Sequence, residues 1–286
     1  MSEHKKAPPL RSSFTKKTPL PITKLVSIVF ALAIVSPLLY AERVLDGDKL
    51  SGIKGIDDRV LVNGAHKPWQ AIGKIYTADL ALCTGVLITP NHVLTAAHCI
   101  WNKNTNSPID NQHLEFVTGY HRERFLAGRS VRHVRHSPRY KSDQNSSVSL
   151  HSLTSDWAIL ALESAIYNVT PIPISSLTMQ ELMAAKQTLA VIQAGYSGDR
   201  PYILTANKRC KVTKKYHNQP LIGHDCDATK GDSGSPLLVK INGQFQLIAI
   251  HVGTEQHSNG RSVGVAITPP FTPTKSLTSK EPSLPF

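Results

Sequence analysis

Short apolar runs, separated by turn-forming residues, follow one another along most of this chain. The clearest runs cover residues 81–88, 114–119, 131–136, 157–162, 188–196, 236–239 and 244–252. Runs of this length between turn residues are typical of all-β folds. Asn242 and Gly243 separate the last two runs, and this dipeptide favours a tight hairpin turn. The pattern therefore predicts a protein built mainly from strands.

Three other segments depart from this pattern. Thr178 precedes a predicted helix at residues 179–186, and Glu181 follows three residues later, which is the spacing of a capping box. Residues 143–155 are rich in Ser and Asn, and we expect a mobile loop there. Residues 268–286 hold five prolines and many Ser, Thr and Lys, a composition typical of a disordered tail. The folded part is thus predicted to end near residue 267.

The N-terminal residues have the order of an export signal. Six Lys/Arg side chains precede an almost unbroken apolar run at residues 25–40, and cleavage is predicted after Ala41. The run is near the lower length limit for a membrane span, so an uncleaved anchor at residues 1–41 is the alternative. Either way the remainder is exported. We therefore expect a secreted or periplasmic protein, with the anchored form as alternative, and residues 42–56 as a propeptide or flexible linker.

The charge of the chain excludes few partners. The formal net charge is +12, and residues 1–41 hold six Lys/Arg and one Glu, which leaves +7 for the rest. No cluster of Lys and Arg interleaved with aromatic residues follows the N-terminus, so nucleic acid is not an expected partner. We interpret the remaining charge as a solvated basic surface.

The four cysteines are Cys83, Cys99, Cys210 and Cys226. An even number in an exported chain predicts two disulfides, and the sequence alone leaves three connectivities open. A zinc site is the rival interpretation, but no Cys-x-x-Cys pair is present. No metal and no other cofactor is expected.

A histidine, a carboxylate and a serine occur in motifs that suit nucleophilic catalysis. His98 follows two alanines, Asp156 precedes an apolar run, and Ser233 lies between Gly231 and Gly234. A serine hydroxyl needs a base to take its proton, and that base needs a carboxylate to fix its tautomer. The glycines permit a tight turn whose N–H groups can point at an oxyanion. Each motif alone would be an ordinary turn, but their order and apolar surroundings favour a catalytic set.

With these motifs the chain resembles a chymotrypsin-like (trypsin-fold) serine protease from about Asp57 to Ile267. Segments at residues 55–59, 68–72, 83–88, 194–196, 199–201 and 224–227 resemble the bacterial branch that includes the glutamyl endopeptidases. The resemblance implies an all-β protease domain at residues 57–267, with two six-stranded antiparallel β-barrels and the active site in the cleft between them. It also selects the disulfides Cys83–Cys99 and Cys210–Cys226. Each closes a loop of about 15 residues, worth roughly 3 kcal/mol in the chain-entropy model.

The resemblance implies an exported serine endopeptidase that cleaves proteins or peptides through an acyl-enzyme on Ser233. His98 is then the general base and acid, Asp156 orients it, and the N–H groups of Gly231 and Ser233 bind the oxyanion. We expect a monomer that meets a membrane only if residues 1–41 are retained. The rivals are a catalytically silent binding module on a protease fold and a membrane-tethered envelope scaffold. The intact set of three residues counts against the first, and retention of residues 1–41 would indicate the second.

The resemblance also raises the question of activation. In trypsin-like enzymes the carboxylate at the position of Asp232 pairs with a new N-terminal ammonium after cleavage, and a simple turn cap is the alternative. Residues that follow Arg43 and Arg59 resemble such cleavage sites, whereas alignment with the glutamyl branch places the terminus near Ile53. A mature N-terminus near Val44, Ile53 or Val60 therefore stays open.

Two residues give conflicting signals about substrate specificity. Asp227 lies six residues before Ser233, where trypsin-like enzymes hold the carboxylate that binds Lys or Arg, although Cys226 before it departs from their pattern. His251 lies where the glutamyl branch places a histidine that binds Glu. At an effective dielectric near 20, two unit charges about 4 Å apart interact by roughly 4 kcal/mol. If Asp227 lines the pocket, we therefore expect faster cleavage after Lys or Arg than after Glu.

Overall fold

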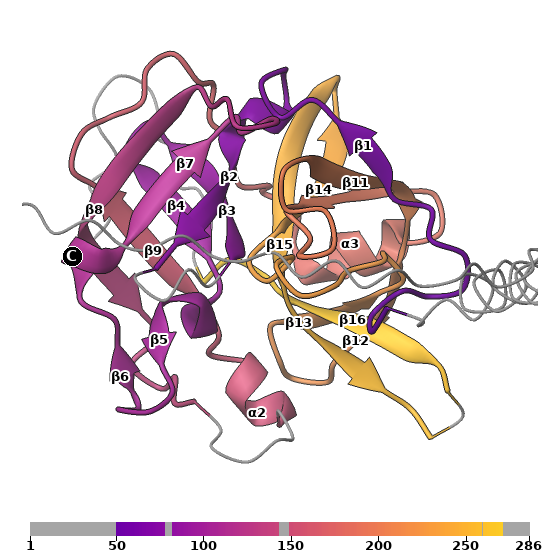
Figure 1. Cartoon of the computed structure of the whole chain (residues 1–286). Coiled ribbons are helices and arrows are strands. Elements are labelled where there is room, and N and C mark those ends of the chain that lie inside the picture. Colours follow the sequence, from indigo (N-terminus) through magenta and orange to yellow (C-terminus); the bar gives the residue numbers. More distant parts are fainter. Residues whose placement is uncertain (1–49, 78–81, 143–148, 259, 271–286) are drawn as a thin grey trace, which may run out of the picture. The chain divides into compact units, whose positions relative to one another are not determined.

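The computed structural model describes residues 50–77, 82–142, 149–258 and 260–270, and these residues form mostly strands (Figure 1). They lie in the second of two units into which the chain divides, Leu50–Phe286. The expected export signal, most of the expected tail and part of the expected loop at 143–155 lie outside the described residues. No helix within the described ranges has the length and apolar character needed to cross a membrane.

The first half of the domain is a closed six-stranded antiparallel barrel, as expected. Its strands follow the order β2-β3-β4-β9-β8-β7. They are β2 (Ile72–Tyr76), β3 (Cys83–Thr89), β4 (His92–Thr95), β7 (Glu115–Thr118), β8 (Ala127–His136) and β9 (Ala158–Leu162). Fully buried side chains such as Ile72, Leu94, Phe116 and Leu160 fill its interior. Two short strands, β5 (Trp101–Asn102) and β6 (Ser107–Pro108), form a separate hairpin beside it.

The second half is an eight-stranded antiparallel sheet with the order β1-β11-β10-β14-β15-β16-β13-β12. Its strands are β1 (Val60–Val62), β10 (Val191–Gly195), β11 (Leu204–Cys210), β12 (Val212–Lys215), β13 (Leu221–His224), β14 (Pro236–Ile241), β15 (Gln244–Gln256) and β16 (Ser262–Ile267). This half is the second barrel of the expected fold, and its sheet includes short strands at the edges. The sheet gains its edge strand because Val60, Leu61 and Val62 pair with β11, and in the described part of the chain no ladder joins the two edges.

The local signals in the sequence form the expected structures. Asn242 and Gly243 join β14 to β15 with φ angles of 49° and 83°, the positive values that a type I′ hairpin turn requires. Helix α3 (Met179–Ala185) begins at the expected capping box. The Glu181 N–H donates to Thr178 Oγ1 at 3.2 Å, and the Glu181 carboxylate accepts from the Thr178 N–H at 2.8 Å.

Residues 52–59, here called the N-terminal segment, pack against the second half of the domain. Ile53 is buried, and the carbonyl oxygen of Gly52 accepts a hydrogen bond from the N–H of Ala228. The N–H of Lys54 donates to the carboxylate of Asp227 at 2.6 Å. Residues 52–56, which were expected within a propeptide or flexible linker, therefore belong to the folded unit.

A buried arginine holds the end of this segment. The Arg59 side chain is 1% exposed, and its Nη2 lies 2.9 Å from Asp57 and 2.8 Å from Asp199. A second arginine, Arg200, contacts Asp57 at 2.6 Å. A buried guanidinium without carboxylate partners would be strongly destabilising. Arg59 is thus enclosed and Val60 is paired with β11 in the uncleaved chain, and the mature N-terminus near Val44, Ile53 or Val60 stays a prediction.

Hydrogen bonding from Arg59 lowers the pKa of Asp57 from 3.8 to about 2. A lowered folded-state pKa adds stability above the unfolded-state value. We therefore expect the contribution of this ion pair to be complete above about pH 4 and lost as the pH falls towards 2. Acid unfolding of the wild type and of Asp57→Asn, followed by circular dichroism, would show this as a difference that disappears at low pH.

Asp199→Asn should lower the free energy of unfolding by about 1–3 kcal/mol, because it removes a charged acceptor from a buried guanidinium. Urea denaturation measures the change. Glu163→Gln alters an exposed carboxylate on the same domain and serves as the control, with an expected change within about 0.5 kcal/mol. Equal effects of the two substitutions would show that Asp199 contributes no more than a surface charge.

Candidate active site

Asp156 fixes both the backbone and the ring of His98. One carboxylate oxygen accepts the His98 backbone N–H at 2.9 Å, and the other lies 2.7 Å from ring Nδ1. His98 lies in a 3₁₀ turn (Ala97–Ile100) that follows β4, and Asp156 immediately precedes Trp157 and strand β9. Strands β4 and β9 are hydrogen-bonded neighbours, so the barrel itself brings the two residues together. This geometry makes Nδ1 the donor and leaves Nε2 free to accept a proton.

The electrostatic surroundings of His98 suit a base. Burial disfavours the imidazolium, but the charge and hydrogen bond of Asp156 outweigh it, so the pKa of His98 is raised above 6.5. The Asp156 side chain is 4% exposed, whereas that of His98 is 28% exposed. The carboxylate is therefore sheltered while the ring can meet a substrate.

The turn that carries Ser233 depends on two glycines with positive φ. Gly231 has φ 95° and Gly234 has φ 79°. A Cβ atom at Gly234 would lie 2.2 Å from the carbonyl oxygen of Thr84 and 2.3 Å from Oγ1 of Thr95. Both the backbone conformation and the close packing therefore require glycine at this position.

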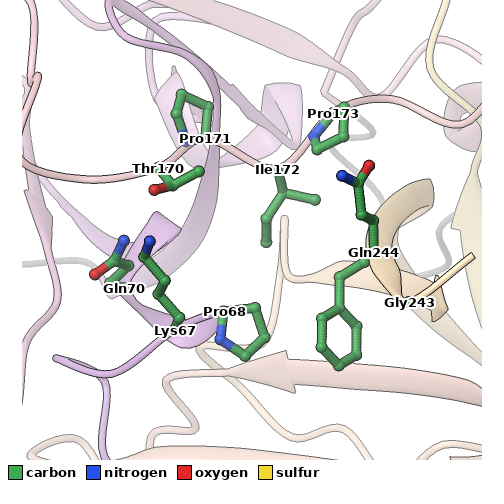
Figure 2. A pocket seen from close by; sticks show the side chains of 10 residues that line it. Lys67, Pro68, Gln70, Thr170, Pro171, Ile172, Pro173, Gly243 and Gln244 are labelled. Atoms are coloured by element: carbon green, nitrogen blue, oxygen red, sulfur yellow. The ribbon is translucent and has the colours of Figure 1, made fainter.

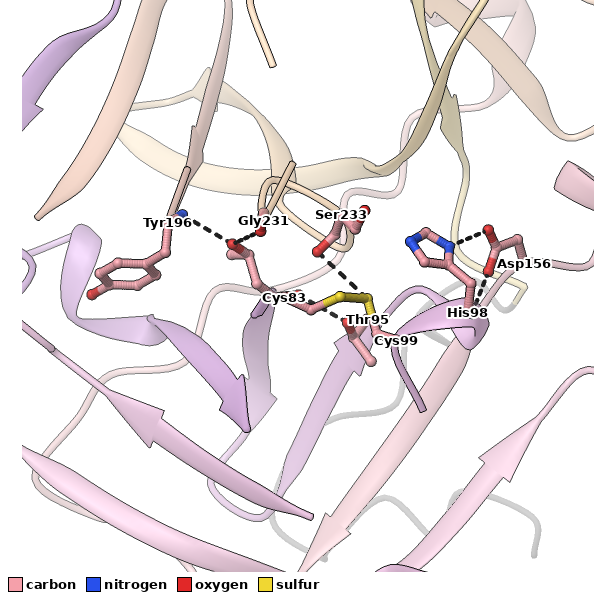
Figure 3. Close-up of a disulfide and its surroundings, with 9 residues drawn as sticks. Cys83, Thr95, His98, Cys99, Asp156, Tyr196, Gly231 and Ser233 are labelled. Atoms are coloured by element: carbon pink, nitrogen blue, oxygen red, sulfur yellow. Dashed lines mark hydrogen bonds and ion pairs between the residues drawn. A yellow bond between two sulfur atoms is a disulfide. The ribbon is translucent and has the colours of Figure 1, made fainter. Parts of the chain in front are cut away.

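Hydrogen bonds from both halves of the domain hold the backbone of this turn. On the side of the first barrel, the Thr84 N–H donates to the Ser233 carbonyl at 2.8 Å, and Thr84 Oγ1 donates to the Gly231 carbonyl at 2.9 Å. On the side of the second, the Gly234 N–H donates to the His251 carbonyl at 2.7 Å. Figure 3 shows the His98 ring between Ser233 and Asp156.

Both expected disulfides are present, Cys83–Cys99 and Cys210–Cys226. The Cys99 sulfur lies 3.7 Å from the Ser233 carbonyl oxygen, so the first disulfide packs between the histidine turn and the serine turn (Figure 3). Although Cys83, Cys99 and His98 cluster closely, the two sulfurs are bonded to each other and offer no thiolate to a metal.

The predicted oxyanion donors lie in the same turn. Among the described residues, no acceptor is found for the N–H groups of Gly231 and Ser233, whereas the neighbouring N–H groups of Asp232 and Gly234 are hydrogen-bonded within the protein. Two unpaired N–H groups on one turn are what an oxyanion site needs.

Asp232 is buried beneath this turn. One carboxylate oxygen accepts from the Thr229 N–H at 2.7 Å and from Ser197 Oγ at 2.8 Å. The other oxygen has no hydrogen-bond partner within the described ranges. Burial raises the pKa of Asp232 to about 6. The expected ion pair with a new N-terminus thus remains a prediction, and the internal donors support the turn-cap alternative.

Asp227 is directed at the N-terminal segment. Its carboxylate is buried and accepts from the backbone N–H groups of Lys54 at 2.6 Å and Asp58 at 3.3 Å. Its carbonyl oxygen accepts from Asn207. Whether Asp227 also meets a basic substrate side chain stays a prediction, and the two backbone donors support the alternative of a structural loop residue. The sequence placed Asp227 by its distance from Ser233 and could not show that a segment 173 residues away binds it.

His251 forms a buried pair with His224. Nδ1 of His251 lies 3.0 Å from Nε2 of His224, and one of the two rings donates. Burial lowers the pKa of His251 to about 3, with further contributions from Lys54 and His98. The pKa of His224 is likewise lowered well below 6.5 by burial, His251 and Lys54. Both rings are therefore neutral at physiological pH.

The cavities of the domain separate into one beside the catalytic residues and others away from them. A cavity of about 640 Å³ is lined by Pro68, Ile172, Pro173 and Phe245 among others, and contains none of the catalytic candidates (Figure 2). A smaller cavity of about 220 Å³ includes His98, Asp156, Lys103 and Lys141 in its lining. The smaller cavity lies next to His98, the candidate base, and is therefore a better candidate for substrate contact than the larger one.

Sequence reasoning missed three residues that shape this site. Thr84 holds the serine turn, His224 pairs with His251, and Lys54 lies near both histidines. Thr84 directly follows Cys83, so the sequence could have indicated that it lies beside the first disulfide. His224 begins one of the segments that resemble the glutamyl branch, whereas no local pattern pointed to Lys54.

The chain is similar to known proteins over most of the described domain. A family model for trypsin matches residues 58–272. The chain is 29% identical over 229 residues to vitamin K-dependent protein C of Mus musculus, a match that covers 71% of this chain and 47% of that protein. It is 26% identical over 214 residues to urokinase-type plasminogen activator of Gallus gallus, covering 64% of this chain and 48% of that protein. The chain thus spans about half the length of the curated relatives it matches.

A solved structure described as a Glu endopeptidase in complex with MPD is similar to this one, with a TM-score of 0.59 and 23% identity. The match covers 76% of this chain and 93% of the other. This likeness confirms the trypsin-like two-barrel fold. Because the family model spans most of the folded unit, the chain belongs to the trypsin family of serine proteases.

Proposed function

We propose that this chain is an exported serine endopeptidase that uses Ser233, His98 and Asp156. The observation that carries the proposal is the double contact of Asp156 with His98, which leaves Nε2 available next to the serine turn. A binding module with no catalytic role would not need a buried carboxylate to select the tautomer of a half-exposed histidine. Two disulfides support export, because such bonds persist in oxidising compartments.

The reaction would proceed by acyl transfer. Ser233 Oγ attacks the scissile carbonyl while His98 Nε2 takes its proton, and Asp156 stabilises the imidazolium. The N–H groups of Gly231 and Ser233 receive the developing oxyanion. His98 then gives its proton to the leaving amine, and water hydrolyses the ester on Ser233 by the same steps in reverse roles.

We further propose that the substrate-binding pocket favours an acidic side chain through His251. Asp227, the competing candidate, is occupied by the N-terminal segment. A neutral His251 can still donate a ring N–H to a carboxylate. The neighbouring cavity beside His98 also has two lysines, Lys103 and Lys141, in its lining, and no carboxylate other than that of Asp156.

Ser233→Ala should abolish peptide hydrolysis, with a loss on the order of 10⁴-fold or more in turnover, because the nucleophile is removed. Labelling by a serine-directed fluorophosphonate should disappear as well. Ser258→Ala, on the loop after β15, is the matched control and should keep both signals. Labelling that persists in Ser233→Ala would disprove the assignment of the nucleophile.

Asp156→Asn should lower turnover about 10⁴-fold near neutral pH, because His98 would adopt the wrong tautomer. In the wild type, kcat/KM should fall as the pH drops through the raised pKa of His98, above 6.5. The acidic limb should move to lower pH in the variant, since the carboxylate that raises this pKa is gone. A pH–rate profile of both proteins tests this. A loss of only a few-fold with an unmoved limb would exclude Asp156 as the orienting carboxylate.

Peptides that differ only in the residue before the scissile bond should be cleaved faster with Glu than with Lys. The comparison uses kcat/KM for Glu, Gln, Lys and Ala at that position. His251→Ala should reduce the preference for Glu. Asp227→Asn should leave the relative kcat/KM of the Lys peptide unchanged. A wild-type preference for Lys that disappears in Asp227→Asn would restore Asp227 as the specificity residue.

A further inference from the structure

Lys54 brings a positive charge from the N-terminal segment to the second half of the domain. Its Nζ donates to the carbonyl oxygen of Cys226 at 2.5 Å and to that of Gly52 at 3.2 Å. Its backbone N–H is held by Asp227, so both ends of the residue are fixed. An ammonium carries three donors, and two carbonyl oxygens leave one for a further acceptor.

The ammonium lies close to the histidine pair. Cys226, which it contacts, follows His224 by two residues at the end of β13. The charge of Lys54 helps to lower the pKa of both His224 and His251, so it is within electrostatic reach of the two rings. Two histidines and one lysine thus converge on the region where His251 was expected to bind substrate.

The carboxylates that face Lys54 are already engaged by other donors. Asp227 binds two backbone N–H groups of the N-terminal segment, Asp225 accepts from the Lys211 N–H, and Asp232 accepts from Thr229 and Ser197. In the described part of the chain, none of them lies within ion-pair distance of Lys54 Nζ. The ammonium is therefore half-buried, bonded to carbonyl oxygens and without a direct ion pair, although these three carboxylates act on it from a longer distance.

We propose that Lys54 is a specificity-determining residue whose ammonium supplies the lasting positive charge for an acidic substrate side chain bound beside His251. The inference rests on the proposed function of this site and adds the source of its charge. Neutral histidines can orient a carboxylate by hydrogen bonds but cannot balance its charge, and an uncompensated carboxylate is costly to desolvate. Lys54 removes that cost, and the pair of histidines sets the geometry.

The experiment compares peptides with Glu or Gln before the scissile bond, which differ in charge but hardly in shape. It uses the full chain as wild type, Lys54→Met, Lys54→Arg and Lys208→Met. The Glu/Gln ratio of kcat/KM should fall by about 10- to 100-fold in Lys54→Met, the loss expected for one charge at a short distance in a partly solvated site. Lys54→Arg should keep most of the ratio, because it keeps the charge. Lys208→Met removes an exposed charge on β11 and should leave the ratio unchanged.

A ratio that does not change in Lys54→Met would overturn the proposal, and equal loss in Lys54→Met and Lys54→Arg would show a role in packing instead of charge. The pH dependence of the wild type needs no folded variant. Burial lowers the pKa of Lys54 from 10.5 despite the nearby carboxylates. The Glu preference should therefore fall on the alkaline side, as the lysine loses its proton below the ordinary range of a lysine. A preference that is lost already above about pH 6.5 would assign the charge to the histidines and reject Lys54.

The outcome is separable from that of the proposed function. If the wild type shows no hydrolysis that depends on Ser233, the proposed endopeptidase function is refuted. The role of Lys54 is judged only by the Glu/Gln ratio. The preference can also be measured without turnover, as the ratio of the affinities of Ser233→Ala for two peptide amides. One peptide ends in Glu and the other in Gln. Equal affinities for the two peptides in the presence of Lys54 would also overturn the proposal.

Discussion

The arrangement of the site depends on the hydrogen bonds that Thr84 makes across the two halves of the domain. Its N–H and Oγ1 both donate to carbonyl oxygens of the serine turn, and its own carbonyl accepts from Thr95. Thr84 follows Cys83, whose disulfide partner Cys99 directly follows His98. The histidine turn, the disulfide and the serine turn are therefore one connected unit. This explains how the base from the first barrel and the nucleophile from the second keep their relative positions in a domain whose halves are separate sheets.

Buried charges do a second structural task, in the N-terminal segment. Arg59 requires Asp57 and Asp199, and Asp227 requires the backbone donors of Lys54 and Asp58, because each of these charges would otherwise be buried without compensation. The result is that the segment is attached to the loop that precedes the nucleophile. Processing between residues 52 and 59 would therefore remove groups that bind the loop at Asp227.

The sequence predicted those features that local chemistry decides. The Gly-Asp-Ser-Gly turn, the capping box at Thr178 and the Asn-Gly hairpin are each determined by residues within a few positions of each other. All three local structures formed as expected. The disulfide pairs followed from resemblance and are present. The direction of Asp227 and the edge strand β1 were not predictable in this way, because each depends on a partner more than a hundred residues away. Contacts between residues so far apart are set by the packing of the whole domain, and the sequence around each partner carries no local signal for them.

The separation of binding charge from catalytic charge follows from these contacts. His98 must become a cation in the transition state, and its charge already contributes to lowering the pKa of His251. A protonated His251 would therefore oppose the imidazolium that catalysis requires. Burial keeps His251 neutral and avoids this repulsion. Lys54, the proposed source of positive charge for the substrate, does not contribute to the shifted pKa of His98, whereas Lys103 does. In the proposed function, a neutral His251 and a charge on the N-terminal segment would together bind an acidic side chain without weakening the base.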